Sequence, residues 1–171
     1  YSAQSRFKNK IPNAGLIGKK AALGALKKIG QTKIKSGTYS MLVENRAAMR
    51  LISMLISPMS ASSIQQKSSY MDGMIHKSIT SEILSITDNP FIKEALGSKI
   101  FDGEGIATRE RSIISKGILQ QYYIDSYYGK KLGMEPNGGS SSNLIFSTGN
   151  QSVNELKKKK KNGILVTGFN G

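Results

Sequence analysis

Apolar residues recur at helical spacing in one central segment of the chain, residues 44–56. Pro58 is placed to end this predicted helix. Residues 14–29 predict an earlier helix, although lysines interrupt its apolar side, and Gly30 is placed to end it. The short apolar run 39–43 between the two predicted helices is typical of a strand. The residues that share the apolar side of the central helix are Ala47, Leu51, Met54 and Leu55.

Short β-prone runs dominate the second half of the chain. Residues 79–87 and 144–147 each predict one strand, and residues 164–167 predict the last one. Residues 111–124 predict two strands joined by a hairpin turn at residues 116–117. Helices mixed with hairpin-connected strands predict an α+β fold of mixed helices and antiparallel strands.

Capping residues mark two further helices. Asp125 is placed to begin a short helix that Gly133 ends. Ser152 and Glu155 have the spacing of a capping box, in which each side chain accepts a hydrogen bond from the other residue's amide. The helix that this box opens is predicted to run into five consecutive lysines, residues 157–161.

The charge divides the chain into an arm and a body. The formal net charge is +14. Residues 1–37 hold nine basic and no acidic residues, whereas residues 38–156 hold 11 of each sign. The arm has a single Arg, Arg6, and few aromatic residues, whereas base recognition favours Arg forks and aromatic platforms. A solvated lysine surface is therefore favoured over specific nucleic-acid binding.

Composition excludes several kinds of site. The chain has no Cys and one His, His76, so a self-contained catalytic zinc site with two or three imidazoles is excluded. No apolar run approaches the roughly 20 residues that cross a bilayer, so we expect no membrane span. The glycine–serine stretch 138–142 lacks the terminal lysine of a phosphate-binding loop and predicts a flexible loop.

Two groups of residues could carry chemistry or binding. Asp102 and Glu104 lie in a glycine-rich loop, residues 97–110, where paired carboxylates suit acid–base work or a cation. The structural alternative is a tight turn with Arg109 or Arg111 as ion partner. A tyrosine cluster follows the predicted hairpin and could line a peptide groove or pack in the core. Its members are Tyr122, Tyr123, Tyr127 and Tyr128.

Three stretches of the sequence together resemble the TldD/PmbA family, also called modulators of DNA gyrase. They are residues 38–55, 85–133 and 162–171. Members of the family are much longer, so the resemblance implies a truncated chain. The most specific residues are Gly97-Ser98, the run Phe101 to Gly105, Thr108, Ile113-Ile114, the run Gly117 to Leu119 and the run Lys131 to Gly133.

The resemblance separates two branches of this family. TldD-type members carry a His-Glu-x-x-x-His zinc motif on the helix that follows the first of these strands. Here that helix begins with residues 44–50, ENRAAMR, which contain neither His. The chain therefore resembles the PmbA branch, also called TldE, which lacks the zinc site.

For such a chain the resemblance implies a non-catalytic subunit. It would support a TldD-type zinc metalloprotease that degrades or processes unfolded peptides in the cytoplasm, with the zinc on the partner. The expected partners are a TldD-type subunit or a second copy, together with peptide substrates. No catalytic or metal-binding residue carries over. We expect the surface that faces peptide or partner to include Asp102, Glu104, Tyr122, Tyr123 and Tyr127.

The resemblance also suggests how the chain is divided. Residues 1–37 would be a basic arm and helix that end a preceding region. Residues 38–171 would be a PmbA/TldD-type C-terminal domain. Its last strand runs into a turn at the end of the printed sequence, which leads us to expect a domain that is incomplete there.

The alternative to the protease-subunit hypothesis is a basic module that binds nucleic acid or another polyanion. In that case the lysine-rich segments would contact phosphates, and affinity would fall steeply with salt. A protein–protein interface with an apolar core would be far less sensitive to salt.

Overall fold

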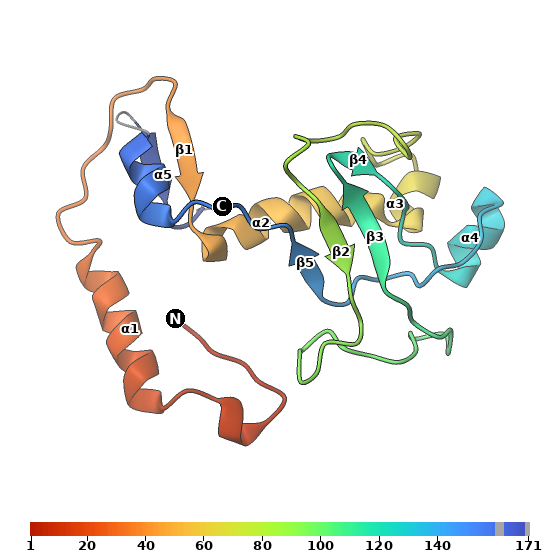
Figure 1. Cartoon of the computed structure of the whole chain (residues 1–171), viewed down its shortest axis with the longest axis horizontal. Coiled ribbons are helices and arrows are strands. Elements are labelled where there is room, and N and C mark those ends of the chain that lie inside the picture. Colours follow the sequence, from red (N-terminus) through yellow and green to blue (C-terminus); the bar gives the residue numbers. More distant parts are fainter. Residues whose placement is uncertain (160–162, 170–171) are drawn as a thin grey trace.

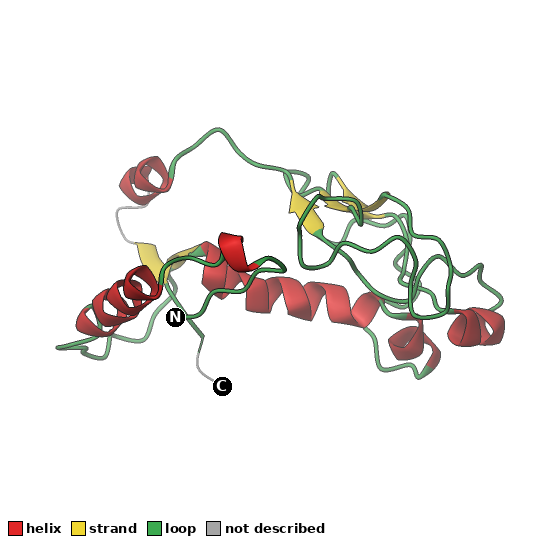
Figure 2. Cartoon of the chain, turned by 90° about the horizontal axis from the view of Figure 1, so that it is seen from below, coloured by secondary structure: helices red, strands yellow, loops and turns green. Residues whose placement is uncertain are grey.

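Helix α2 (Asn45–Ile56) joins two groups of secondary-structure elements (Figure 1). The computed structural model describes residues 1–159 and 163–169. One group holds a two-stranded sheet with helices α1 (Ala14–Leu26) and α5 (Val153–Lys159). The other holds a four-stranded sheet with helices α3 (Ala61–Gln65) and α4 (Ser126–Leu132). Figure 2 shows α2 running beneath the larger sheet towards the smaller one.

The four-stranded sheet is antiparallel and has the order β4-β3-β2-β5. This confirms the predicted α+β class, with helices mixed among antiparallel strands. Two short 3₁₀ helices, η1 (Lys8–Lys10) and η2 (Ser57–Met59), complete the helical elements of the described residues. The strands are β2 (Ile86–Asp88), β3 (Arg111–Ser115), β4 (Ile118–Leu119) and β5 (Leu144–Phe146).

The hydrophobic core lies between this sheet and the helices around it. Ile113 and Ile114 are adjacent on β3 and are both fully buried, so the central strand is covered on both faces. Leu55 and Ile56 pack against the same core and anchor the carboxyl end of α2. The other large apolar residues that are fully buried are Met59, Ile86 and Leu119.

The hairpin predicted over residues 111–124 is confirmed by β3 and β4, although β4 ends at Leu119. Its two turn residues both have positive φ, 45° at Lys116 and 79° at Gly117, as a tight two-residue hairpin requires. A Cβ at Gly117 would lie 2.4 Å from the carbonyl oxygen of Thr80. Only glycine therefore lets the preceding segment approach the turn.

The strand predicted over residues 79–87 is mostly wrong, since only Ile86–Asp88 forms a strand. Residues 76–84 instead follow the outer edge of β4 and then turn. The amide of Ile79 donates to the carbonyl of Gly117, and the amide of Leu84 donates to Ser81 within the turn. β-Branched residues suit this edge contact as well as they suit a continuous strand.

The smaller sheet pairs β1 (Ser40–Val43) with β6 (Gly163–Val166) in parallel, an arrangement that the sequence does not predict. The amide of Glu44 extends the pairing by donating to the carbonyl of Val166. Helix α1 buries none of its residues. The basic arm reaches the segment between β2 and β3, where the Arg6 guanidinium donates to the carbonyls of Leu96 and Ser98.

Both predicted helix starts are confirmed. The Asp125 carboxylate accepts from the Tyr128 amide at 2.8 Å, and α4 ends at Gly133 in the left-handed conformation. Ser152 and Glu155 exchange the two hydrogen bonds of a capping box at the start of α5. The last two lysines of the predicted run, residues 160–161, lie outside the described residues. No helix in the described part of the chain is long and apolar enough to cross a membrane.

Replacing Leu119 by alanine tests the position of the core. Leu119 is fully buried, so we expect Leu119→Ala to lower the free energy of unfolding by about 2–5 kcal/mol. The neighbouring Ile118 is 38% exposed, and Ile118→Ala should change it by only about 0.5 kcal/mol. Urea unfolding of both variants provides the measurement, and equal losses would contradict the described packing.

Candidate functional site

A buried ion pair joins the two central strands of the larger sheet. Asp88 and Arg111 are direct cross-strand partners on β2 and β3. The Arg111 Nε and Nη2 atoms lie 3.3 Å and 3.2 Å from Asp88 Oδ2. The Asp88 residue is 1% exposed and the Arg111 residue 9%. Such a pair offsets its desolvation only if its remaining polar atoms also find partners.

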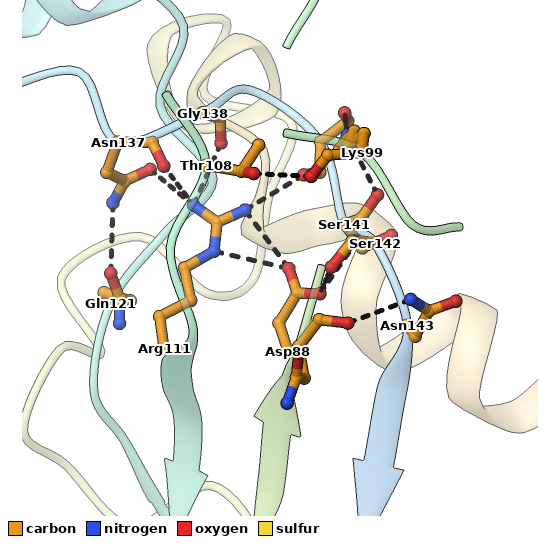
Figure 3. Close-up of polar contacts among 12 residues, drawn as sticks. Asp88, Lys99, Thr108, Arg111, Gln121, Asn137, Gly138, Ser141, Ser142 and Asn143 are labelled. Carbon is orange, nitrogen blue, oxygen red and sulfur yellow. Dashed lines mark hydrogen bonds and ion pairs between the residues drawn. The ribbon is translucent and has the colours of Figure 1, made fainter. Parts of the chain in front are cut away.

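The loop between α4 and β5 supplies those partners (Figure 3). The second Asp88 oxygen accepts from the amide of Ser142 at 2.8 Å and from its hydroxyl. Arg111 Nη1 donates to Gly138 O at 3.1 Å, and Nη2 donates to Ser140 O at 2.9 Å. The ion pair therefore holds residues 137–142 in one arrangement, so the flexible loop that the sequence predicts over residues 138–142 is wrong.

Asn137 connects the same loop to the chain that follows the hairpin. Its Oδ1 accepts from Arg111 Nη1 and from the amide of Ile124, both at 3.0 Å. Its amide nitrogen donates to Gln121 Oε1 at 3.2 Å and to the Tyr122 carbonyl at 2.9 Å. All the hydrogen-bonding capacity of a short side chain is used to hold three segments together.

A second asparagine, Asn143, ties this loop to the glycine-rich loop 97–110. Its Oδ1 accepts from the Gly97 amide at 3.0 Å, and its amide nitrogen donates to Ser98 Oγ and Asn89 O at 2.9 Å. A Cβ at Gly97 would lie 2.4 Å from the Ser142 carbonyl oxygen, so glycine permits the close approach. Lys99 Nζ adds a bond of 2.7 Å to Ser140 Oγ.

Tyr123 covers one face of the ion pair. The Arg111 guanidinium carbon lies 4.6 Å from the centre of the Tyr123 ring, a cation–π distance. Burial raises the pKa of Tyr123 above its usual value, and the Asp88 carboxylate adds to the increase while Arg111 opposes it. The Asp88 oxygens are already bonded to Arg111 and Ser142, and within the described residues the buried Tyr123 hydroxyl has no hydrogen-bond partner.

The carboxylates of Asp102 and Glu104 have structural partners of their own. Asp102 Oδ1 accepts from the amides of Glu104 and Ile106, both at 2.9 Å, which confirms the tight turn. Glu104 Oε2 accepts from the amide and the hydroxyl of Ser126, both at 2.9 Å, at the start of α4. The prediction that Arg111 is an ion partner of this turn is wrong, because Arg111 pairs with Asp88 instead.

The tyrosine cluster is divided between core and surface. Tyr122 and Tyr123 are each 3% exposed, so the prediction that they face a peptide or partner at the surface is wrong. The Tyr122 hydroxyl donates to the Met71 carbonyl inside the core. Tyr127 is 59% exposed and packs edge-to-face on Tyr128, with the ring centres 4.9 Å apart. Of the five expected surface residues, Asp102, Glu104 and Tyr127 stay a prediction.

The residues of α2 do not fit a zinc ion. Its first turns carry Glu44, Asn45 and Arg46, and no imidazole or thiolate stands among them. His76, the one His of the chain, is exposed in a left-handed turn beside the outer edge of β4. Within residues 1–159 and 163–169, no three His, Cys, Asp or Glu side chains gather at metal-binding distance.

Asp88, Arg111 and their partners in residues 137–142 form what we call the ion-pair cluster. This cluster holds loops in place and leaves no room for a substrate. The hollow beside it, lined by Asp88, Arg111, Lys99 and neighbouring residues, measures about 10 Å³, which is the space of one water molecule. The sequence alone does not reveal this cluster, because it offers Arg111 as an ion partner for the carboxylates of loop 97–110 and gives no role to Asp88. The sequence does offer a signal: Asp88 directly follows the predicted strand 79–87, and Arg111 opens the next predicted strand.

Removing the Asp88 charge tests the ion pair. We expect Asp88→Asn to lower the free energy of unfolding by about 3–5 kcal/mol, because it leaves the Arg111 cation buried without its counter-ion. Asp72 forms an exposed pair with Lys67 at 2.8 Å, and Asp72→Asn should cost no more than about 1 kcal/mol. Denaturant unfolding compares the two, and similar costs would refute a buried pair.

Replacing Tyr123 by phenylalanine tests the unpartnered hydroxyl. At neutral pH we expect Tyr123→Phe to leave the free energy of unfolding unchanged or to raise it by up to about 1 kcal/mol, because no hydrogen bond is lost. The raised pKa keeps folded Tyr123 neutral while the unfolded side chain ionises near pH 10. The wild-type chain should therefore lose stability as pH rises above about 10, and Tyr123→Phe should lose less. A destabilised variant at neutral pH would mean that the hydroxyl bonds to Asp88.

Comparisons with known proteins agree with one another. The family of the "PmbA/TldA metallopeptidase C-terminal domain" matches residues 36–171. The "Metalloprotease PmbA homolog" of Buchnera aphidicola from Acyrthosiphon pisum is 34% identical over all of this chain. The chain spans 39% of that relative's length.

Solved structures show the same similarity. A crystal structure of a putative modulator of DNA gyrase from Bacteroides thetaiotaomicron matches 98% of this chain with a TM-score of 0.92 and 42% identity, over 38% of the solved chain. TldE from Thermococcus kodakarensis has the same fold, with a TM-score of 0.72 at 22% identity over 90% of this chain and 38% of the solved one. The family match over most of the chain and these structural similarities lead to one conclusion: the chain belongs to the PmbA/TldD family of metallopeptidase-related proteins.

Proposed function

We propose that this chain is part of a non-catalytic, PmbA/TldE-like subunit that supports a TldD-type zinc metalloprotease acting on unfolded peptides. One observation carries the proposal: in a member of a metallopeptidase-related family, helix α2 follows β1 directly but offers no zinc ligand. Names such as "Zinc metalloprotease TldD homolog" belong to relatives that share part of this sequence. Because the chain spans about two fifths of its relatives, the activity of the whole protein is part of the proposal.

In this proposal the chain contributes a shaped surface, and the zinc and its activated water belong to the partner. The ion-pair cluster holds loops 97–110 and 137–143 against each other, so their outer surfaces keep one shape. Asp102, Glu104 and Tyr127 lie on this part of the molecule and are the proposed contacts with peptide or partner. We place the assembly in the cytoplasm, which suits a chain without cysteine.

Peptide cleavage with and without a TldD-type partner tests the proposal. We expect no cleavage of an unstructured peptide by this chain alone, because its one His cannot complete a zinc site. Cleavage by the partner should become faster when the chain is added and should stop with a zinc chelator. Mass spectrometry of the peptide products at fixed partner concentration measures both effects.

Two controls make this experiment decisive. Zinc added in excess of the chelator should restore cleavage, and the Asp88→Asn variant should stimulate less, in proportion to the fraction that is unfolded. Cleavage by the isolated chain would overturn the proposal, as would a partner whose rate does not respond to the chain.

A further inference from the structure

The ion-pair cluster contains two neighbouring residues with a chemistry of their own, Asn137 and Gly138. In an Asn–Gly sequence the glycine amide nitrogen can attack the side-chain carbonyl carbon of the asparagine, because no Cβ shields that nitrogen. Ammonia leaves, and water opens the resulting succinimide ring to aspartate or isoaspartate. Asn–Gly also occurs at residues 162–163 and 170–171, but Asn137 is the one asparagine of these pairs that lies among the described residues.

The fold requires both residues of this pair. Gly138 has a φ of 95°, which residues with a side chain rarely adopt, so glycine has to follow Asn137. The Asn137 side chain accepts two hydrogen bonds through Oδ1 and donates two through its amide nitrogen. An ionised aspartate could not donate, because a carboxylate has no N–H. The cluster therefore depends on a sequence that is prone to deamidation.

Hydrogen bonds also hold the peptide unit between the two residues. The Asn137 amide donates to Ile124 O at 3.0 Å. Arg111 Nη1 donates to the Asn137 carbonyl and, at 3.1 Å, to Gly138 O. For the ring to close, the side chain and this peptide unit must rotate until the nitrogen reaches the side-chain carbon at attacking distance. The hydrogen bonds of the closed cluster oppose both rotations.

Opening of the cluster releases these groups together. Arg111 contacts both the main chain and the side chain of Asn137, so its separation from the loop frees the peptide unit and Oδ1 at once. When opening and closing are fast, a chemical step that needs the open state proceeds in proportion to the population of that state. The rate of deamidation at Asn137 should therefore measure how often the cluster opens.

We propose that Asn137 is a deamidation site that the closed ion-pair cluster protects, and that its conversion to aspartate or isoaspartate during an opening prevents the cluster from closing again. The Gly138 N–H gives its proton to hydroxide, the nitrogen bonds to Cγ of Asn137, and Nδ2 leaves as ammonia with a proton from water. A water molecule then breaks one C–N bond of the ring. The reaction needs no oxidant and no other co-reactant.

Either product removes contacts that the cluster needs. In aspartate, the oxygen that replaces the amide nitrogen faces Gln121 Oε1 and the Tyr122 carbonyl, so acceptors face acceptors. Isoaspartate also lengthens the main chain by a methylene group, which displaces Gly138 O from Arg111. The modification would therefore permanently remove the loop shape that the ion pair maintains. This inference is independent of any protease partner.

Ageing of the full chain in neutral buffer tests the protection. The reference is a synthetic peptide of residues 132–143 in the same buffer. Mass spectrometry of proteolytic fragments assigns each amide-to-acid conversion to its residue and separates residue 137 from residues 162 and 170. We expect Asn137 to deamidate at least about tenfold more slowly in the folded chain than in the peptide. In urea that unfolds the chain, the two rates should agree within about twofold. Equal rates without urea would overturn the inference, as would a rate that urea leaves unchanged.

Two pairs of variants show whether the cluster provides the protection. Asp88→Asn removes the counter-ion of the buried pair and should speed deamidation at least about tenfold, whereas Asp72→Asn at the exposed pair should change it less than about twofold. Gln121→Ala removes one acceptor of the Asn137 amide and should speed deamidation about fivefold. Gln120→Ala at the neighbouring position is its control. Gln121→Ala keeps the test decisive if Asp88→Asn does not fold, and an unchanged rate in Gln121→Ala would refute the protection.

Direct replacement of the side chain tests the consequence of the modification. Asn137→Asp creates the aspartate product, and Asn150→Asp places the same charge at an exposed position as the control. We expect the amides of residues 137–142 to exchange hydrogen at least about tenfold faster in Asn137→Asp, and its urea midpoint to fall. Asn150→Asp should match the wild-type chain in both measurements. An Asn137→Asp chain with wild-type exchange and midpoint would overturn the claim that deamidation keeps the cluster open.

Discussion

The larger sheet depends on the pair formed by Asp88 and Arg111. Both charges are buried, and their Coulomb attraction alone would not offset the loss of hydration. What stabilises them is the set of carbonyl, amide and hydroxyl groups that the loop 137–142 brings to the pair. The dependence is mutual, because that loop contains no large apolar side chain and has no other reason to adopt one shape. The shape of loop 137–142, at the surface next to the sheet, thus follows from the buried charges of Asp88 and Arg111.

Helix α2 places the smaller sheet relative to this core. Its carboxyl end is anchored by Leu55 and Ile56, while its amino end follows directly on β1. Along the helix between them, Met49, Leu51 and Met54 remain exposed. The helix therefore links the two groups of elements, and its residues 45–56 include no His, Cys, Asp or Glu.

Local signals in the sequence predicted much of the fold. The caps at Asp125 and Ser152 and the turn at Gly117 depend on residues close to one another in the chain, so a pattern over a few positions is enough to find them. The parallel pairing of β1 with β6 joins positions more than 120 residues apart, and no local pattern encodes it. The buried pair escaped detection for the same reason, since Arg111 could have met any of several carboxylates. Tyr122 and Tyr123 show a further limit, because a hydroxyl-bearing ring suits a surface groove and a core equally well.

The spacing of the groups around Asp88 also has a kinetic consequence. Its partners Arg111 and Ser142 lie 23 and 54 residues away along the chain, so two large loops must close before the carboxylate has both its counter-ion and its hydrogen bonds. Until then a charged group opposes collapse of the sheet around it, so we expect the cluster to form late in folding, after both loops have closed. In the reverse direction, a local opening that separates Ser142 from Asp88 also releases the Arg111 contacts. Loops 97–110 and 137–143 should therefore open as one cooperative unit rather than fray separately.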